Sequence, residues 1–214
     1  MPTDDRYNFE PEVGLLGNWG YRDRKDDPAF RDADELAVGP TAGHCGGLPE
    51  IWIDHPHWVS MEARAANSEG KGSVTLTDLV RQCLRMRPDR IVLGEVRGAE
   101  LRDLLMALNT GHEGGCGTVH ANGVAEVPAR LEALAALGGL SREAASAQIT
   151  AALHTVIHVE RGERGRRVAE IGVFVDVEGR AVVLPAVRWD ADGVMTLGDG
   201  AGRLSQLLGM EVAR

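Results

Sequence analysis

The sequence is poor in lysine: Lys25 and Lys71 are its only two lysines, and every other basic residue is an arginine. It contains no apolar run that approaches the roughly 18 residues of a membrane-spanning helix. Its three cysteines share no C-x-x-C spacing, and its first residues are acidic and polar, unlike a secretory signal. We therefore expect a chain that works in the reducing cytoplasm without disulfides or structural zinc.

Negative charge is concentrated near the start of the chain. The formal net charge is −9 over 214 residues. Residues 1–58 hold 12 acidic against 5 basic residues, and residues 59–214 hold 20 against 18. A nucleic-acid-coating surface needs a clustered basic patch. We therefore expect no direct binding of nucleic acid.

Length and apolar content bound the domain organisation. A chain of 214 residues with 43% hydrophobic residues can bury one core with a small appendage. Residues 1–48 are rich in Asp, Gly and Pro and show no sustained apolar period. We predict a weakly ordered acidic segment over 1–48, a main domain over 49–189 and a tail over 190–214.

The secondary-structure pattern changes along the main domain. From residue 75 helices alternate with short strands, and from residue 154 the period is two, which is typical of strands that meander. This order predicts an α/β core with a partly antiparallel flank near the C-terminus. The expected helices are 78–87 (capped by Thr77, closed by Pro88), 99–108, 124–137, 142–153 (capped by Ser141) and a short 202–208; the expected strands are 90–95, 117–120, 154–160, 167–175 and 180–189, with a further strand pair within 50–62.

Two polar side chains end neighbouring predicted strands. Glu95 ends the apolar run Ile91-Val92-Leu93, and His120 ends the next strand. An α/β sheet gathers such residues at one edge, and Arg97 lies two residues beyond the glutamate. In a nucleotidase a glutamate at this place orients a water toward a terminal phosphate. A plain surface carboxylate is the alternative interpretation.

His112 and His120 are separated by seven residues, several of them glycine. A pair of histidines with ordinary polar partners is one interpretation; a role beside phosphate is another, because imidazole titrates near neutrality. Zinc ligation is disfavoured, since clustered Cys or His partners are missing. A metal-dependent hydrolase built on Glu95, His112 and His120 would rest on residue types alone. We expect no metal site.

The block SEGKGSVTLTDLVRQCLRMRPDRIVLGEVRGAELRDLLMALNTGHEGGCGTVHAN closely resembles the type II/type IV secretion ATPases, nearest to the Flp (Tad-type) pilus and conjugal-transfer-associated branch. RIVLGEVRG resembles the family's Walker B box, and TGHEGGCGTVHAN resembles its His box. The likeness runs from about His55 to about Val175. It implies a RecA-like P-loop NTPase core that uses ATP and Mg²⁺. It also implies a hexamer at the inner face of the cytoplasmic membrane, beside the platform proteins of a secretion or pilus machine.

By this resemblance, Glu95 takes the place of the Walker B catalytic glutamate. His112 and His120 take the places of the His-box histidines, which resemble γ-phosphate sensors. Guanidinium groups match phosphate in fork geometry, although for Arg85 a solvent-facing charge is an equal alternative. The residues expected to contact the cofactor or a neighbouring subunit are Arg85, Arg87, Arg97, Thr110 and Gly111.

The chain departs from the family in its phosphate-binding motifs. The P-loop G-x-x-x-x-G-K-[ST] holds phosphates through backbone N–H groups and its lysine. Lys25 follows no glycine; Lys71 follows one, but Ala65 and Gly72 replace the first Gly and the Ser/Thr. The family's Asp box is lost as well, because Gly46-Gly47 stands where Glu-Asp is expected. The resemblance therefore covers a core fragment that lacks the P-loop.

Three explanations of this departure stay open. The chain is a truncated or frameshifted product of a full ATPase gene, a degenerate paralogue that binds or regulates an intact ATPase hexamer, or an active motor with a different phosphate site. A binding module that docks onto an intact homologue is a related alternative. Since the P-loop is the main phosphate anchor, we expect the chain alone to show little or no ATP turnover.

Overall fold

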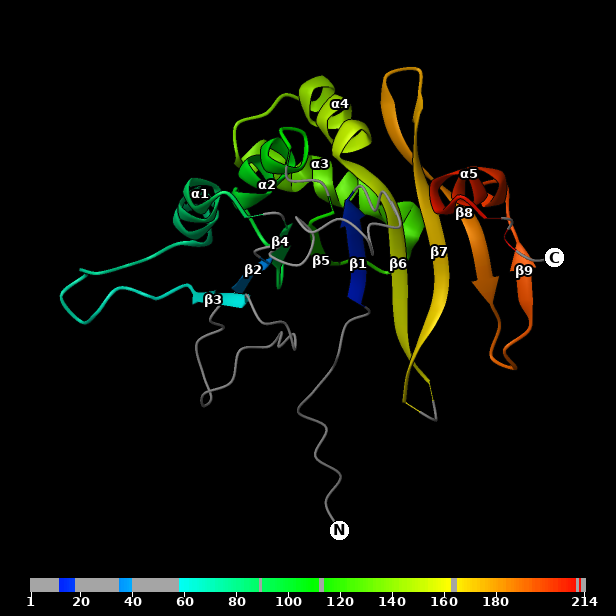
Figure 1. Cartoon of the computed structure of the whole chain (residues 1–214), viewed down its shortest axis with the longest axis horizontal. Coiled ribbons are helices and arrows are strands. Elements are labelled where there is room, and N and C mark those ends of the chain that lie inside the picture. Colours follow the sequence, from blue (N-terminus) through cyan, green and yellow to red (C-terminus); the bar gives the residue numbers. More distant parts are fainter. Residues whose placement is uncertain are drawn as a thin grey trace, which may run out of the picture.

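The computed structural model describes residues 12–17, 35–39, 58–88, 90–111, 114–162, 165–210 and 212. Over these residues the chain forms one sheet with the strand order β3-β2-β4-β5-β1-β6-β7-β8-β9 (Figure 1). The strands are β1 (Glu12–Gly17), β2 (Glu35–Gly39), β3 (Trp58–Glu62), β4 (Arg90–Leu93), β5 (Cys116–His120), β6 (Leu153–Gly162), β7 (Gly165–Val177), β8 (Arg180–Trp189) and β9 (Met195–Leu197). The helices are α1 (Leu76–Met86), α2 (Glu100–Leu108), α3 (Val127–Leu137), α4 (Arg142–Ala152) and α5 (Ala201–Leu208).

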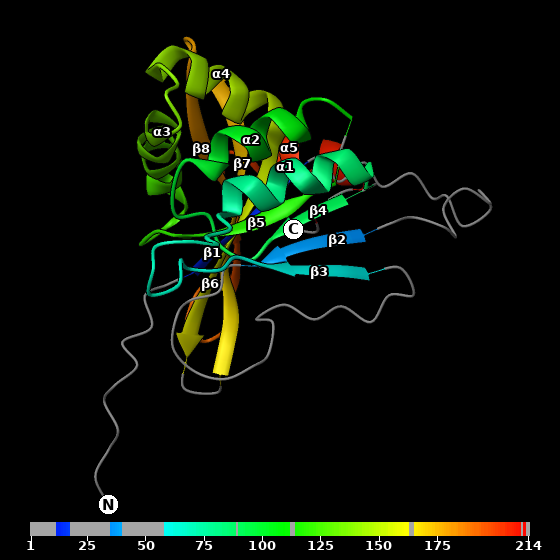
Figure 2. The same cartoon turned by 90° about the vertical axis from the view of Figure 1, so that its left-hand side faces the viewer.

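The sheet has a parallel part and an antiparallel part. Strands β3, β2, β4 and β5 pair in parallel, and Figure 2 shows α1 and α2 lying over this part. Strand β1 runs antiparallel to both of its neighbours, β5 and β6. The pairs β6–β7, β7–β8 and β8–β9 are also antiparallel. The predicted α/β core with an antiparallel C-terminal flank is therefore confirmed.

Strands β1 and β2 come from the first 48 residues, where no strand was predicted. β2 lies between β3 and β4, and β1 lies between β5 and β6. Both strands contribute backbone pairing to the middle of the sheet. The predicted strand pair within 50–62 is described only from residue 58, where β3 begins; its first half lies outside the described residues.

Helix α1 begins in a capping box. The Thr75 hydroxyl accepts a hydrogen bond from the Asp78 N–H at 3.1 Å, and the Asp78 carboxylate accepts one from the Thr75 N–H at 3.0 Å. A hydrogen bond from the Thr75 hydroxyl is the main cause that lowers the pKa of Asp78. The predicted cap at Thr77 is thus wrong by two residues, because Thr75 is the threonine with an acidic partner three residues later.

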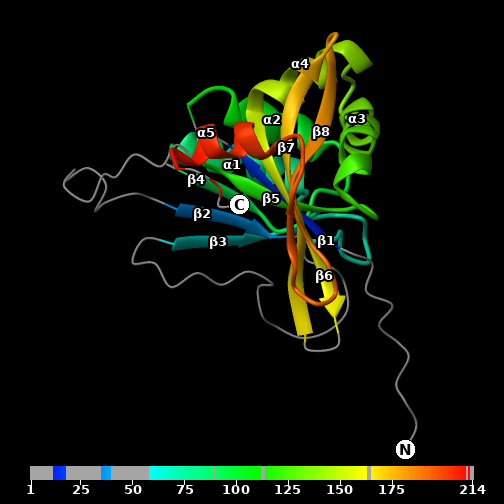
Figure 3. The same cartoon turned by 90° about the vertical axis from the view of Figure 1, so that its right-hand side faces the viewer.

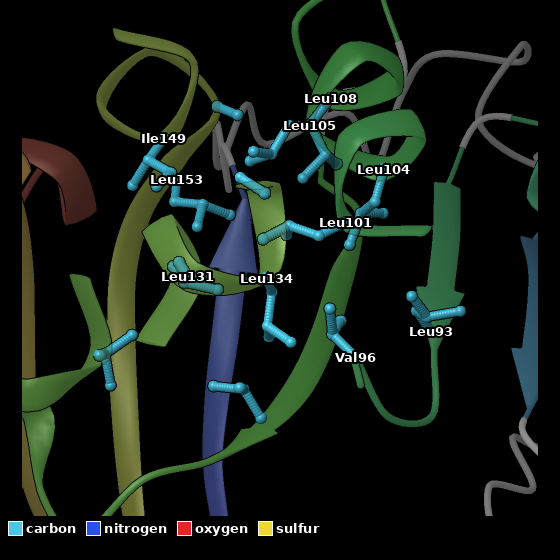
Figure 4. Packing of buried hydrophobic residues seen from close by; sticks show 14 of the residues in the cluster. Leu93, Val96, Leu101, Leu104, Leu105, Leu108, Leu131, Leu134, Ile149 and Leu153 are labelled. Atoms are coloured by element: carbon cyan, nitrogen blue, oxygen red, sulfur yellow. The ribbon is translucent and has the colours of Figure 1, made fainter. Parts of the chain in front are cut away.

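The main core lies between the sheet and helices α1 to α4. The predicted inward side chains of α2 are buried at the spacing of a helical face: Leu101, Leu104, Leu105 and Leu108. Figure 4 shows them facing Leu131 and Leu134 of α3 and Ile149 of α4. Burying each such side chain contributes roughly 1.5–3 kcal/mol. This packing fixes α2, and with it the loop that leads into α2 from β4.

The remaining helices follow the prediction with small shifts. The segment predicted as one helix from residue 124 starts with a 3-10 turn, Val124–Glu126, and becomes α3 at Val127, with Pro128 in its first turn. Ser141 caps α4 through a hydrogen bond from the Ala144 N–H at 3.2 Å, as predicted.

A second, smaller apolar cluster joins α5 to the antiparallel part of the sheet. Its buried members are Val173 of β7, Ala186 and Val187 of β8 and Leu204 of α5. Figure 3 shows α5 beside β7 and β8, on the side away from α3. The helix predicted at 202–208 is therefore confirmed, and β9 is an additional strand within the predicted tail.

The described cysteines, Cys83 and Cys116, are thiols outside any disulfide bond. Cys83 is buried on the inner face of α1, and burial raises the pKa of its thiol to about 12. Cys116 begins β5 and is half-buried. Cys45 lies outside the described residues. Among the described helices, none is long and apolar enough to span a membrane.

Candidate active site

The loop from Gly94 to Gly98 connects β4 to α2 and carries Glu95 at the carboxyl edge of the parallel strands. It is held against β5 by one residue. The Thr118 hydroxyl donates to the Gly94 carbonyl, and the Val96 N–H donates to the Thr118 carbonyl at 2.8 Å. Val96 itself is buried in the core. Glu95 therefore projects from a loop that is fixed by its neighbours on both sides.

Glu95 lies between two basic side chains. One of its carboxylate oxygens pairs with the Arg97 guanidinium, and the other lies 3.1 Å from Nε2 of His120 at the end of β5. The glutamate is 7% exposed, whereas the side chain of Arg97 is 55% exposed. As predicted, the carboxylate that follows one strand lies beside the histidine at the end of the next strand. We call Glu95, Arg97 and His120 the Glu95 cluster.

His120 has a second nitrogen with no partner. Its Nδ1 is buried and makes no hydrogen bond within the described part of the chain. In the neutral ring, a proton on Nε2 serves the Glu95 carboxylate, and Nδ1 then remains an acceptor without a donor. A buried polar atom without a partner is costly and is common at functional sites.

Two predicted ligands lie at the other end of β4. Arg85 is in the last turn of α1, and Arg87 is its C-cap, with a left-handed φ of 53°. Both are exposed and precede β4, whereas Glu95 follows it. A four-residue strand spans roughly 13 Å. The structure thus separates both arginines from the Glu95 cluster of the same chain, and their role as contacts to another subunit stays a prediction.

Thr110 and Gly111 also lie away from the cluster. They follow the C-terminal end of α2 and precede β5, so the length of β5 separates them from His120. The Thr110 hydroxyl donates to the Met106 carbonyl at 2.7 Å, and Gly111 is exposed with a φ of 101°. Their role in cofactor binding stays a prediction. His112 lies outside the described residues, so its predicted role beside phosphate is not tested.

Lys71 lies in an exposed turn. The backbone pairs of Asn67 with Lys71 and of Arg64 with Val74 close this turn between β3 and α1. Lys71 is thus several residues away from the start of α1, unlike a P-loop lysine, which lies at a helix N-terminus. Lys25 lies outside the described residues. The described chain therefore shows no lysine in a phosphate-binding turn.

The side chains of the Glu95 cluster suit one part of a nucleotide, its terminal phosphate. A carboxylate, an imidazole and a guanidinium suit a terminal phosphate and the water that attacks it. These three side chains are too few to bind all the phosphates of a triphosphate. No group of three or more His, Cys, Asp or Glu side chains that could hold a metal ion occurs among the described residues.

Two residues that position the cluster were not identified from the sequence. These residues are Thr118 and Glu100, and the sequence analysis singled out neither. Glu100 is buried at the start of α2 and accepts hydrogen bonds from the backbone of the loop. Its position in the first turn of a predicted helix is a signal that could have singled it out.

Comparison with known proteins identifies relatives of this chain. The model of the family described as type II/IV secretion system protein matches residues 49–170. A Mycobacterium tuberculosis protein named for conjugal transfer is 59% identical over 160 residues, which cover 74% of this chain and 44% of the relative. Conjugal transfer protein TrbB of Rhizobium radiobacter is 38% identical over 107 residues, 50% of this chain and 32% of that relative.

A solved structure shows the same fold in part. The crystal structure of the VirB11 ATPase from the Brucella suis type IV secretion system, in complex with sulphate, matches with a TM-score of 0.53 and 26% identity. The match covers 65% of this chain and 40% of that chain. The chain thus spans less than half the length of these relatives. The region matched by the family model includes Glu95, Arg97 and His120, while β1 and β2 precede it.

Proposed function

The chain belongs to the type II/IV secretion system protein family, and on that premise we propose that it is the hydrolytic part of a secretion or conjugal-transfer motor ATPase. The observation that carries this proposal is the Glu95 cluster. A buried carboxylate is held between an imidazole and a guanidinium at the carboxyl edge of parallel strands. Relatives named for conjugal transfer and for type IV secretion support the same assignment.

Each member of the cluster has a distinct role in this proposal. Glu95 accepts a hydrogen bond from the attacking water and orients it, which is worth about 10²- to 10⁴-fold in rate for a general base. Arg97, whose side chain is more than half exposed, stabilises charge that develops on the phosphate oxygens. His120 holds Glu95 through Nε2 and senses the γ-phosphate; its Nδ1 has no hydrogen-bond partner among the described residues. Bound MgATP would supply the phosphoryl group and a divalent cation that offsets its negative charge.

The same cluster does not hold the nucleotide. In this family the P-loop lysine and backbone amides anchor the β- and γ-phosphates, and the sequence contains no such motif. We therefore propose that this chain turns over ATP weakly or not at all by itself. Its partners are a second copy in a hexamer or an intact homologous ATPase, at the cytoplasmic face of the inner membrane beside the platform of a secretion machine.

Fragment complementation tests this proposal. We define the complemented mixture as this chain plus a fragment of a relative that carries the P-loop and ends before the relative's own Walker B strand. We expect the mixture to hydrolyse ATP at a rate at least about tenfold above the sum of its separate components, because the two halves of the site then meet. Phosphate release measures the rate. Stable association without any gain in hydrolysis would contradict a hydrolytic role.

A non-catalytic regulator of an intact ATPase hexamer is the second candidate. Three exposed apolar side chains near the C-terminus favour it: Val194 at 58%, Leu208 at 44% and Met210 at 63% exposure. Exposed apolar side chains that gather in one region can mark a protein-binding surface. A regulator would change the rate of an intact relative equally well with Glu95→Gln, whereas a hydrolytic part would lose its effect.

A further inference from the structure

Glu100 is a buried carboxylate that binds the backbone of the loop carrying Glu95. It is the first residue of α2 and is 6% exposed. Its Oε1 accepts the N–H of Arg97 at 2.6 Å and the N–H of Gly98 at 2.7 Å. Both bonds are short, as expected when the acceptor carries a charge. The side chain therefore folds back from the helix onto the loop.

The surroundings leave Glu100 little freedom. A Cβ atom added to Gly98 would lie 3.1 Å from its Oε2, so glycine gives the carboxylate room at this position. The N-terminus of α2 also favours a nearby negative charge, because the positive ends of the helix's backbone amide dipoles lie there. Geometry and charge thus both keep Glu100 against the loop.

The loop is consequently fixed from two sides. Thr118 of β5 binds Gly94 and Val96 on one side. Glu100 of α2 binds Arg97 and Gly98 on the other. Glu95 lies between these two attachments, and Arg97 belongs to the segment that Glu100 holds. The ion pair between Glu95 and Arg97 therefore depends on an attachment that neither residue provides.

We propose that Glu100 is a positioning residue that sets the Glu95–Arg97–His120 geometry. It touches neither water nor phosphate in this role and acts through the loop backbone. The expected effect of Glu100 on hydrolysis rests on the proposed function, whereas its expected effect on the loop geometry does not. A residue that only stabilises the start of α2 would leave the geometry of Glu95 and His120 unchanged.

The first test uses the chain alone. In Glu100→Ala, we expect the amides of Arg97 and Gly98 to exchange with solvent at least about tenfold faster. We also expect the His120 imidazole resonances to move in the direction seen in Glu95→Gln, since both changes disturb the contact of Glu95 with Nε2. Glu132→Ala is the matched control, because Glu132 is a half-buried acid paired with Arg142 far along the sequence. Unchanged His120 resonances in Glu100→Ala would overturn the proposal.

The second test is a mutant cycle in the complemented mixture. We expect Glu100→Ala to lower kcat by at least about 30-fold while KM for ATP changes less than about twofold, because orientation is lost and binding is kept. Glu100→Gln, whose amide oxygen can still accept both N–H groups, should recover most of the rate. In the Glu95→Gln background, Glu100→Ala should cost nothing further.

The outcomes separate the two proposals. If Glu100→Ala lowers kcat in the Glu95→Gln background by as much as it does in the original chain, the positioning role is overturned, even if both single variants are slow. If Glu95→Gln itself leaves hydrolysis unchanged, the proposed function fails, while amide exchange and the His120 resonances still decide whether Glu100 positions the loop. If Glu100→Ala does not fold, Glu100→Asp takes its place, because its shorter side chain cannot reach both N–H groups. Faster Arg97 exchange with shifted His120 resonances then supports the role, and unmoved His120 resonances overturn it.

Discussion

Glu95→Gln is expected to lower ATP hydrolysis by the complemented mixture by at least about 100-fold, with a KM for ATP that changes less than about threefold. Glutamine keeps the size of the side chain but cannot accept the proton of the attacking water. It also removes the charge that pairs with Arg97 and His120. Phosphate release at saturating ATP measures the effect.

Glu132→Gln provides the control for this substitution. Like Glu95, Glu132 is a glutamate in an ion pair with an arginine, at 2.9 Å from Arg142, but it is half-buried and lies on α3 outside the cluster. We expect its hydrolysis rate to stay within about twofold of the original chain, since exposed and half-exposed pairs contribute little. Similar losses in both variants would mean that Glu95 matters only for folding.

Gly115→Ala is expected to lower the free energy of unfolding by about 2–3 kcal/mol. A Cβ atom at this position would lie 2.7 Å from the carbonyl oxygen of Ile91 and 2.7 Å from a side-chain carbon of Leu108. The Leu108 side chain could rotate away, but the β4 backbone could not. Strand β5 must then move from β4, and the short pairing of Val92 with Cys116 and Leu93 with Gly117 would be disturbed.

The matched control is Gly123→Ala. Gly123 has an extended φ of −177°, and a Cβ atom there would meet nothing within 4 Å. We expect its free energy of unfolding to change by less than about 0.5 kcal/mol. Urea denaturation of both variants measures the difference. Equal midpoints for the two would contradict the close approach of β4 and β5 at Gly115.

The elements with a strong apolar period could be predicted from the sequence. The buried face of α2 repeats leucine at helical spacing, and β6 to β8 are each ten or more residues long and rich in β-branched residues, so local pattern and tertiary packing agree. Glu95 and His120 were also predicted correctly as neighbours, because both end parallel strands that pair directly.

Other features depend on the whole sheet and could not be predicted. The segments of β1 and β2 are short and lie among Gly, Pro and Asp, and their pairing is with strands far along the chain. The separation of Thr110 and Gly111 from His120 could not be predicted either. Motif spacing places Thr110 and Gly111 close to His120 in sequence, but the direction of β5 puts its two ends at opposite edges of the sheet.

Under the proposed function, the Glu95 cluster is one half of a nucleotide site. The Glu95 cluster is fixed by Thr118 and Glu100, whereas the sequence offers no P-loop to hold a triphosphate. In the family the two halves act on one nucleotide. Under the proposed function, we therefore expect this chain to act on a nucleotide that another polypeptide holds.

The most direct measurement is an equilibrium titration of the purified chain alone with MgATP, followed by calorimetry or by a fluorescent ATP analogue. We predict no saturable binding up to roughly millimolar nucleotide, because the cluster lacks a phosphate-holding lysine and glycine-rich turn. Saturable binding with a Kd in the micromolar range, accompanied by phosphate release that depends on Glu95, would contradict the claim that this chain carries only the hydrolytic half of the site.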